Sequence, residues 1–251
     1  MQRYYEVNGS GHNVRCKLYC NDIHGIRQAV IFIHGFGGHK DNGAAARFGE
    51  VLLSKHRSAA LITFDLPCHG DDVKKKLNLA DCLEYIHMVV ADARQRFGTD
   101  ELYAYATSFG GWLTMNYLHR QGNPFRKVTL RCPAVPMYDV LTTTIMASGD
   151  LSRLSRGKDI PVGFDRKVPV GQQFLQDLRD NDIRQYDFLD YAEDILILHG
   201  TADEVVPMDA AAAFCEEQLI EFIPIEGADH RFRHPRAMDQ AIKAILNFFA
   251  L

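Results

Sequence analysis

Residues 103–113 read Tyr-Ala-Tyr-Ala-Thr-Ser-Phe-Gly-Gly-Trp-Leu, and this segment is the most informative of the sequence. A strand pattern ends at Ala106, and an amphipathic helix pattern begins directly after Ser108. A serine at such a turn is lifted above the sheet edge, with its hydroxyl exposed at the N-terminus of the helix. The usual pattern is G-x-S-x-G, and here Ala106 replaces the first glycine while Gly110 keeps the second. Alanine is still small, so the segment predicts a nucleophilic serine; the alternative is a serine that only caps a helix.

Outward from this segment, short β-rich runs alternate with longer helical patterns, which is typical of the α/β class with a mostly parallel sheet. Continuously apolar central runs predict strands that helices cover on both faces. A turn-rich link after the first run is too short for a helix and predicts an antiparallel hairpin. Apolar residues at helical spacing predict helices over 79–97 and near the C-terminus. The eight expected strands are residues 4–8, 14–19, 29–34, 60–65, 102–106, 127–131, 195–199 and 221–225.

The alternation stops over about residues 133–191, where Ser, Gly, Pro and charges of both signs accumulate. A structureless loop of this length inside a compact domain is uncommon. We therefore expect one domain, residues 1–251, with a small inserted cap over the site, and prefer this to a plain surface excursion.

Composition excludes several classes of protein. The chain is 47% hydrophobic and 24% charged, with a net charge of -4, and it has no concentrated basic block, so we expect no nucleic-acid partner. It has no apolar signal core at its start, and its apolar runs are strand-sized, so we expect a cytoplasmic protein with no membrane partner. Six cysteines are too few for a disulfide scaffold, and Cys16 and Cys20 lack a second ligand pair, so no metal site is expected.

Two loops carry the base and the acid that a nucleophilic Ser108 would need. Asp203 follows the seventh expected strand, and His230 follows the eighth. A serine hydroxyl needs a base to take its proton, and histidine suits that task when a carboxylate fixes its tautomer. The chain order Ser108, Asp203, His230 is the order expected for three residues on loops at strand ends. Asp229 and Asp139 are rival acids. Asp229 is adjacent to His230 in the chain, and adjacent side chains rarely face each other. Asp139 follows the sixth expected strand, but Asp203 has the better context because it lies in a tight loop that is aimed back at the site.

Acyl transfer also requires N–H donors for the oxyanion. The residue after the nucleophile normally supplies one, here Phe109, and the turn at residues 34–38 would supply the other, from Phe36. The spacing of this turn fits neither a P-loop nor a dinucleotide fingerprint, so a nucleotide site is not expected. We expect His34 to be buried and structural.

These motifs together resemble the α/β-hydrolase superfamily over nearly the whole chain. Within it, the chain is most similar to the compact bacterial cinnamoyl/feruloyl esterases, which are related to serine aminopeptidase-like and monoacylglycerol-lipase-like hydrolases. The matching segments are residues 34–38, 64–71, 199–207 and 227–232, with a weaker match at 161–165 in the inserted segment. The resemblance implies an α/β-hydrolase fold and a carboxylic-ester substrate whose acyl or aromatic group lies under the cap.

Two departures from that group concern substrate more than catalysis. Thr107 stands where the esterases usually have histidine, and Cys68 stands where a glycine is common.

We therefore expect a serine hydrolase that cleaves esters of small or cinnamoyl-type acids without a cofactor. A serine peptidase, with Glu193, Asp150 or Asp159 holding the substrate amine, is one alternative. A non-catalytic binding protein on the same fold is the other. The oligomeric state stays open, with a homodimer as one option.

Overall fold

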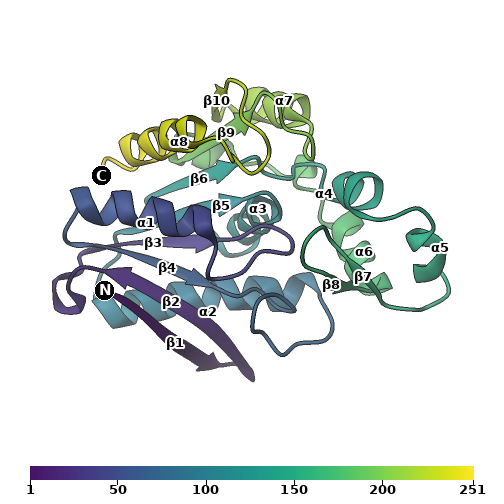
Figure 1. The fold of residues 1–251 in the computed structure, drawn as a ribbon, viewed down its shortest axis with the longest axis horizontal. Coiled ribbons are helices and arrows are strands. Elements are labelled where there is room, and N and C mark those ends of the chain that lie inside the picture. Colours follow the sequence, from purple (N-terminus) through teal and green to yellow (C-terminus); the bar gives the residue numbers. More distant parts are fainter.

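The computed structural model describes residues 1–251, and its centre is an eight-stranded sheet with the order β1-β2-β4-β3-β5-β6-β9-β10 (Figure 1). Strands β1 and β2 pair with each other antiparallel, and β2 is antiparallel to β4; every other pairing in this sheet is parallel. The strands are β1 (Gln2–Gly9), β2 (His12–Cys20), β3 (Gln28–Ile33), β4 (Ala59–Phe64), β5 (Leu102–Thr107), β6 (Lys127–Arg131), β9 (Ile195–Gly200) and β10 (Glu221–Ile225). The predicted α/β-hydrolase fold, the eight strands and the first hairpin are confirmed.

Helices cover both faces of the sheet. Their apolar stripes belong to two separate core clusters, one under α1 and α8 and the other under α2, α3 and α7. None of them is both long enough and apolar enough to cross a membrane. The helices that flank the sheet are α1 (Gly43–Lys55), α2 (Leu79–Phe97), α3 (Phe109–Gln121), α7 (Met208–Gln218) and α8 (Pro235–Phe248).

The segment where the alternation stops has secondary structure of its own. It gathers beyond the carboxyl ends of the parallel strands, to one side of the sheet (Figure 1). Asn181 joins it to α3, because its carbonyl accepts hydrogen bonds from the side chains of Trp112 and Asn116. The elements of this segment are α4 (Met137–Asp139), a π-helical turn η2 (Val140–Ile145), α5 (Asp150–Leu154), the antiparallel pair β7 (Ile160–Val162) and β8 (Val168–Val170), α6 (Gln172–Asp180), and the 3-10 turns η3 (Ile183–Gln185) and η4 (Leu189–Asp194).

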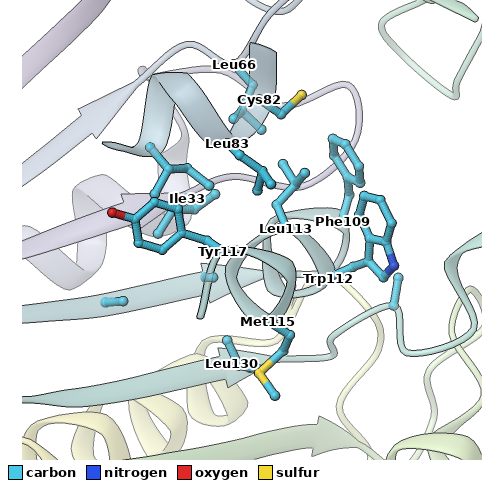
Figure 2. Packing of buried hydrophobic residues seen from close by; sticks show 14 of the residues in the cluster. Ile33, Leu66, Cys82, Leu83, Phe109, Trp112, Leu113, Met115, Tyr117 and Leu130 are labelled. Carbon is cyan, nitrogen blue, oxygen red and sulfur yellow. The ribbon is translucent and has the colours of Figure 1, made fainter. Parts of the chain in front are cut away.

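Helix α3 is buried over most of its length and packs in the middle of the molecule. Trp112 and Leu113 are fully buried, and they pack against side chains from the neighbouring strands and from α2. Figure 2 shows this packing around α3, with labels on Ile33, Leu66, Cys82, Leu83, Phe109, Trp112, Leu113, Met115, Tyr117 and Leu130. Such close approach needs small residues on the first turn of α3: a Cβ at Gly110 would lie 2.3 Å from the Ile33 carbonyl oxygen.

Replacing Gly110 with alanine should therefore destabilise the protein. The new methyl group would collide with two backbone carbonyls of the central strand, which cannot move aside, and we expect a loss of about 3 kcal/mol or more. Gly43→Ala is the matched control, because Gly43 also lies in the first turn of a helix but a Cβ there meets no atom within 4 Å. Urea denaturation measures both; equal stability of the two variants would contradict this account of α3.

Candidate active site

Ser108 lies on the turn between β5 and α3, in a backbone conformation that L-residues rarely adopt. Its φ is 52° and its ψ is -117°. Strand β6 and the loop after it hold the turn: the Ser108 N–H donates to the Arg131 carbonyl at 3.0 Å, and the Ser108 carbonyl accepts from the Ala134 N–H at 3.1 Å. Strain of this kind persists only where the surrounding structure enforces it, and it is typical of functional positions. The hydroxyl is consequently presented at the N-terminus of a buried helix.

Asp203 and His230, predicted from separate loops, are in direct contact. The Nδ1 of His230 lies 2.8 Å from an Asp203 carboxylate oxygen, and the Asp203 side chain is fully buried. The other carboxylate oxygen accepts the N–H groups of Val205 and Val206, each at 2.8 Å. Because the carboxylate accepts at Nδ1, the imidazole presents Nε2 as the free basic nitrogen, which is the tautomer a general base requires.

A second histidine, not singled out from the sequence, supports the carboxylate. The Nε2 of His199, a fully buried residue at the end of β9, lies 3.1 Å from the same Asp203 oxygen. Burial alone would raise the pKa of Asp203, but the hydrogen bonds from His199 and His230 and the charge of His230 hold that pKa well below its ordinary value. Asp203 therefore stays ionised throughout the neutral range. The signal for His199 in the sequence was that a polar residue ends an otherwise apolar strand.

The two rival acids are engaged elsewhere. Asp229 lies 2.7 Å from Arg233, and the Asp139 carboxylate lies 3.8 Å from Arg184 on the inserted segment. Neither one hydrogen-bonds to His230 in the structure.

The loops that carry Asp203 and His230 are tied to each other by their backbones. Thr201 N–H donates to the Ile225 carbonyl and Ala202 N–H to the Ala228 carbonyl, both at 3.0 Å. The structure shows no hydrogen bond between the Ser108 hydroxyl and His230. Such contacts are often long in enzymes without substrate and tighten in the complex.

The two residues expected to supply oxyanion donors lie side by side. The rings of Phe36 and Phe109 meet edge to face, with centroids 5.7 Å apart. Phe36 N–H donates no hydrogen bond within the chain, and Phe109 is the first residue of α3, so its N–H has no carbonyl partner inside the helix. The backbone also comes close here, because a Cβ at Gly35 would lie 3.2 Å from the Cβ of Ser108.

Two buried histidines, His34 and His69, lie beside these phenylalanines and contact each other. His34 bonds the Gly35 carbonyl and accepts from the Leu66 N–H, so its predicted structural role is confirmed. The ring of His69 stacks at 6.2 Å on Phe109 and meets Phe36 edge to face at 5.7 Å. Burial lowers the pKa of His69 to about 4, so the ring is neutral at pH 7.

A buried ion pair fixes the loop that follows β3. Lys40 Nζ lies 2.9 Å from one Asp65 oxygen, and the Lys40 backbone N–H donates to the other at 2.7 Å. Asp71 adds an exposed carboxylate at 2.5 Å from the same ammonium group. The pair thus joins the loop after β3, which carries Phe36, to the loop after β4, which carries His69. No sequence motif marked it, because the partners lie 25 residues apart.

Three side chains near the turn could act as ligands to a cation. The donor atoms of Cys132, Asp203 and His230 lie within 4.8 Å of one another. Two of them, Asp203 and His230, already form the carboxylate–imidazole pair.

Cys68, which stands where the esterases commonly have a glycine, is not one of these three residues. Burial, and to a lesser extent the charge of Asp72, raises the pKa of its thiol to about 12. A pKa this high fits a packing role.

The sheet order and the strained serine turn define the α/β-hydrolase class of fold. Residues 30–244 match the model of the Alpha/beta hydrolase family, and the chain belongs to that family. No curated protein sequence matches it.

Solved structures agree on the fold. Est1E from Butyrivibrio proteoclasticus, solved with ferulic acid bound, is 21% identical with a TM-score of 0.76, over 98% of each chain. Mouse alpha/beta hydrolase domain-containing protein 10 is 15% identical (TM-score 0.72, 99% of this chain and 98% of that one). Monoacylglycerol lipase from Paleococcus ferrophilus is 18% identical (TM-score 0.66, 94% of this chain and 98% of that one).

Removing the buried carboxylate of Asp65 should destabilise the fold. Asp65→Asn removes the one fully buried carboxylate beside the Lys40 ammonium group and leaves it the more exposed Asp41 and Asp71, and we expect a loss of about 3 kcal/mol, at the low end for a broken buried pair. Asp71→Asn is the control, since its side chain is 65% exposed and such pairs contribute about 1 kcal/mol or less. Equal losses in thermal or urea unfolding would contradict the assignment of the buried pair.

His69 should make stability depend on pH. Its pKa of about 4 in the folded protein is below the usual value of about 6.5 in unfolded chains. Between these values only the unfolded chain binds the proton, so the contribution is complete above about pH 6.5 and falls as the pH drops toward 4. We expect wild type to lose about 2 kcal/mol through this group between pH 7 and pH 5.

In His69→Gln that loss should be absent, so its stability should fall less over the same interval. His24→Gln, at an exposed histidine, is the control and should follow wild type. Identical pH profiles for all three proteins in urea denaturation would be inconsistent with a neutral, buried His69.

Proposed function

We propose that the protein is a serine hydrolase that cleaves carboxylic esters, with Ser108, His230 and Asp203 as its catalytic triad. The observation that carries the proposal is the strained turn at Ser108, since a positive φ at a serine between a strand and a helix is typical of functional positions. The hydrogen-bonded pair of Asp203 and His230 at strand ends of the same sheet supports it.

The proposed reaction follows from the chemistry of the groups. His230 Nε2 takes the Ser108 proton while the Ser108 oxygen attacks the ester carbonyl. Backbone N–H groups of Phe36 and Phe109 stabilise the tetrahedral oxyanion. His230 then protonates the departing alcohol, which leaves an acyl-enzyme. Water activated by His230 releases the acid, and buried Asp203 stabilises the imidazolium in both half-reactions.

For the substrate, we propose esters of small or cinnamoyl-type acids. Two features support this choice: the resemblance to cinnamoyl/feruloyl esterases at residues 161–165 and the similarity in fold to Est1E, solved with ferulic acid. A peptidase has no comparable support from two of the three side chains expected to hold an amine. Asp150 is occupied by the Ala147 N–H and Arg153, and Glu193 lines a groove beside α7 and β10.

Hydrolysis of a small substrate panel tests the proposal. The panel is p-nitrophenyl acetate and butyrate, methyl ferulate, and an aminoacyl nitroanilide, each run beside Ser108→Ala. We expect serine-dependent turnover, with methyl ferulate preferred over the simple esters. Turnover of the nitroanilide alone would replace the esterase by a peptidase. Ester turnover that survives in Ser108→Ala would refute the role of Ser108.

The acid is tested by Asp203→Asn. The amide cannot stabilise the imidazolium and favours the wrong tautomer, so kcat should fall by about 10⁴-fold with little change in KM. Asp229→Asn is the matched control on the adjacent loop and should keep most of the activity. If Asp203→Asn were near normal while the control lost activity, the acid would be Asp229.

A further inference from the structure

A cleft that is separate from the candidate active site lies on the α1 and α8 side of the sheet, next to the loop that carries His230. Its volume is about 410 Å³, and it is lined by the first turns of α1 and α8 and by residues 231–233 of the loop between β10 and α8. That volume is within the range of small-molecule sites. Nothing in the proposed ester hydrolysis uses this cleft.

Positive charge dominates its lining. Arg47, Arg231 and Arg233 contribute guanidinium groups, whereas Asp239 is the only acidic residue. Arg47 pairs with Asp239 at 3.1 Å and with Glu50 at 3.7 Å, and Arg231 and Arg233 pair with acids outside the lining. All three arginine side chains are at least half exposed, with relative exposures of 51%, 51% and 67%. Ion pairs this exposed are weak, so an incoming anion can replace them.

A fourth arginine, Arg131, is buried behind the side chains that line the cleft and has no acidic partner. Arg131 is only 6% exposed, and it forms no ion pair in the structure. Its Nε has no hydrogen-bond partner. The guanidinium carbon lies 5.0 Å from the Phe232 ring centroid, and Nη1 donates to the Met238 sulfur at 3.6 Å. Because Phe232 and Met238 both line the cleft, the unpaired positive charge of Arg131 lies directly behind these two lining residues.

The start of α8 adds donors that lack partners. No side chain caps this 14-residue helix, and Pro235 occupies its first turn. The N–H groups at the start of a helix have no carbonyl partners within it and favour negative charge. By contrast, Asn42 caps α1 by accepting the N–H groups of Ala44 and Ala45.

We propose that this cleft binds a small molecule through a phosphate group. Arginine forks bind phosphate oxygens in pairs, and several guanidinium groups match the double charge of a phosphate better than the single charge of a carboxylate. The volume leaves room for an organic group beyond the phosphate. Since Arg231 is adjacent to His230, the ligand would also order the loop that presents this histidine.

Isothermal titration with inorganic phosphate and with phenyl phosphate tests the site, at constant ionic strength set by sodium chloride. Saturable binding to wild type is expected, weakened at least tenfold in Arg47→Gln and in Arg131→Met. Arg126→Gln is the control, because it removes an equally exposed arginine that pairs with Glu101 outside the cleft. Tighter binding of phenyl phosphate would identify a phosphate ester as the occupant, and equal binding would identify free phosphate.

Absence of saturable binding, or equal weakening in Arg126→Gln, would overturn the proposal. If Arg131→Met does not fold, Arg47→Gln decides alone. The titration measures binding and not turnover, so its result is independent of whether Ser108 is the nucleophile.

Discussion

The close approach of α3 to the central strands determines where the serine turn and the loops around it lie. Gly110 has no room for a side chain against the carbonyls of β3, and Ser108 adopts φ 52° so that the chain can reverse from strand to helix. This reversal places a hydroxyl at the carboxyl edge of the sheet, where the loops after β3, β9 and β10 also end. The same turn puts the Phe109 N–H beside the Phe36 loop.

Buried charge then fixes the loops around that turn. Asp203 stays ionised inside the protein because two histidines and two backbone N–H groups satisfy its carboxylate. The Lys40–Asp65 pair joins the loops after β3 and β4. Removing one partner of such a group leaves the other charge buried and uncompensated. The buried charges of Asp203, Lys40 and Asp65 are therefore all paired, and Arg131 differs from them in having no such partner.

Much of this architecture follows from local sequence pattern. All eight strands, α2 and the hairpin were predictable because apolar runs and helical periodicity are local signals, and the Asp203–His230 contact followed from their places at strand ends. The β7–β8 pair was not predictable, since three-residue strands carry almost no periodic signal. Nor was the pairing of Lys40 with Asp65, because only the folded chain brings these partners together. The support of Asp203 by His199 was marked only by a polar residue at the end of an apolar strand, which does not specify its partner.

If Ser108 is the nucleophile that His230 activates, an acyl-enzyme forms on its hydroxyl during turnover, and this intermediate can be trapped. Wild-type protein would be mixed with p-nitrophenyl butyrate, quenched in acid during turnover, digested and examined by mass spectrometry. One butyryl group on Ser108, absent from Ser108→Ala and strongly reduced in His230→Ala, is the predicted result. Turnover with no acylated serine, or acylation at another residue such as Cys68, would contradict the account.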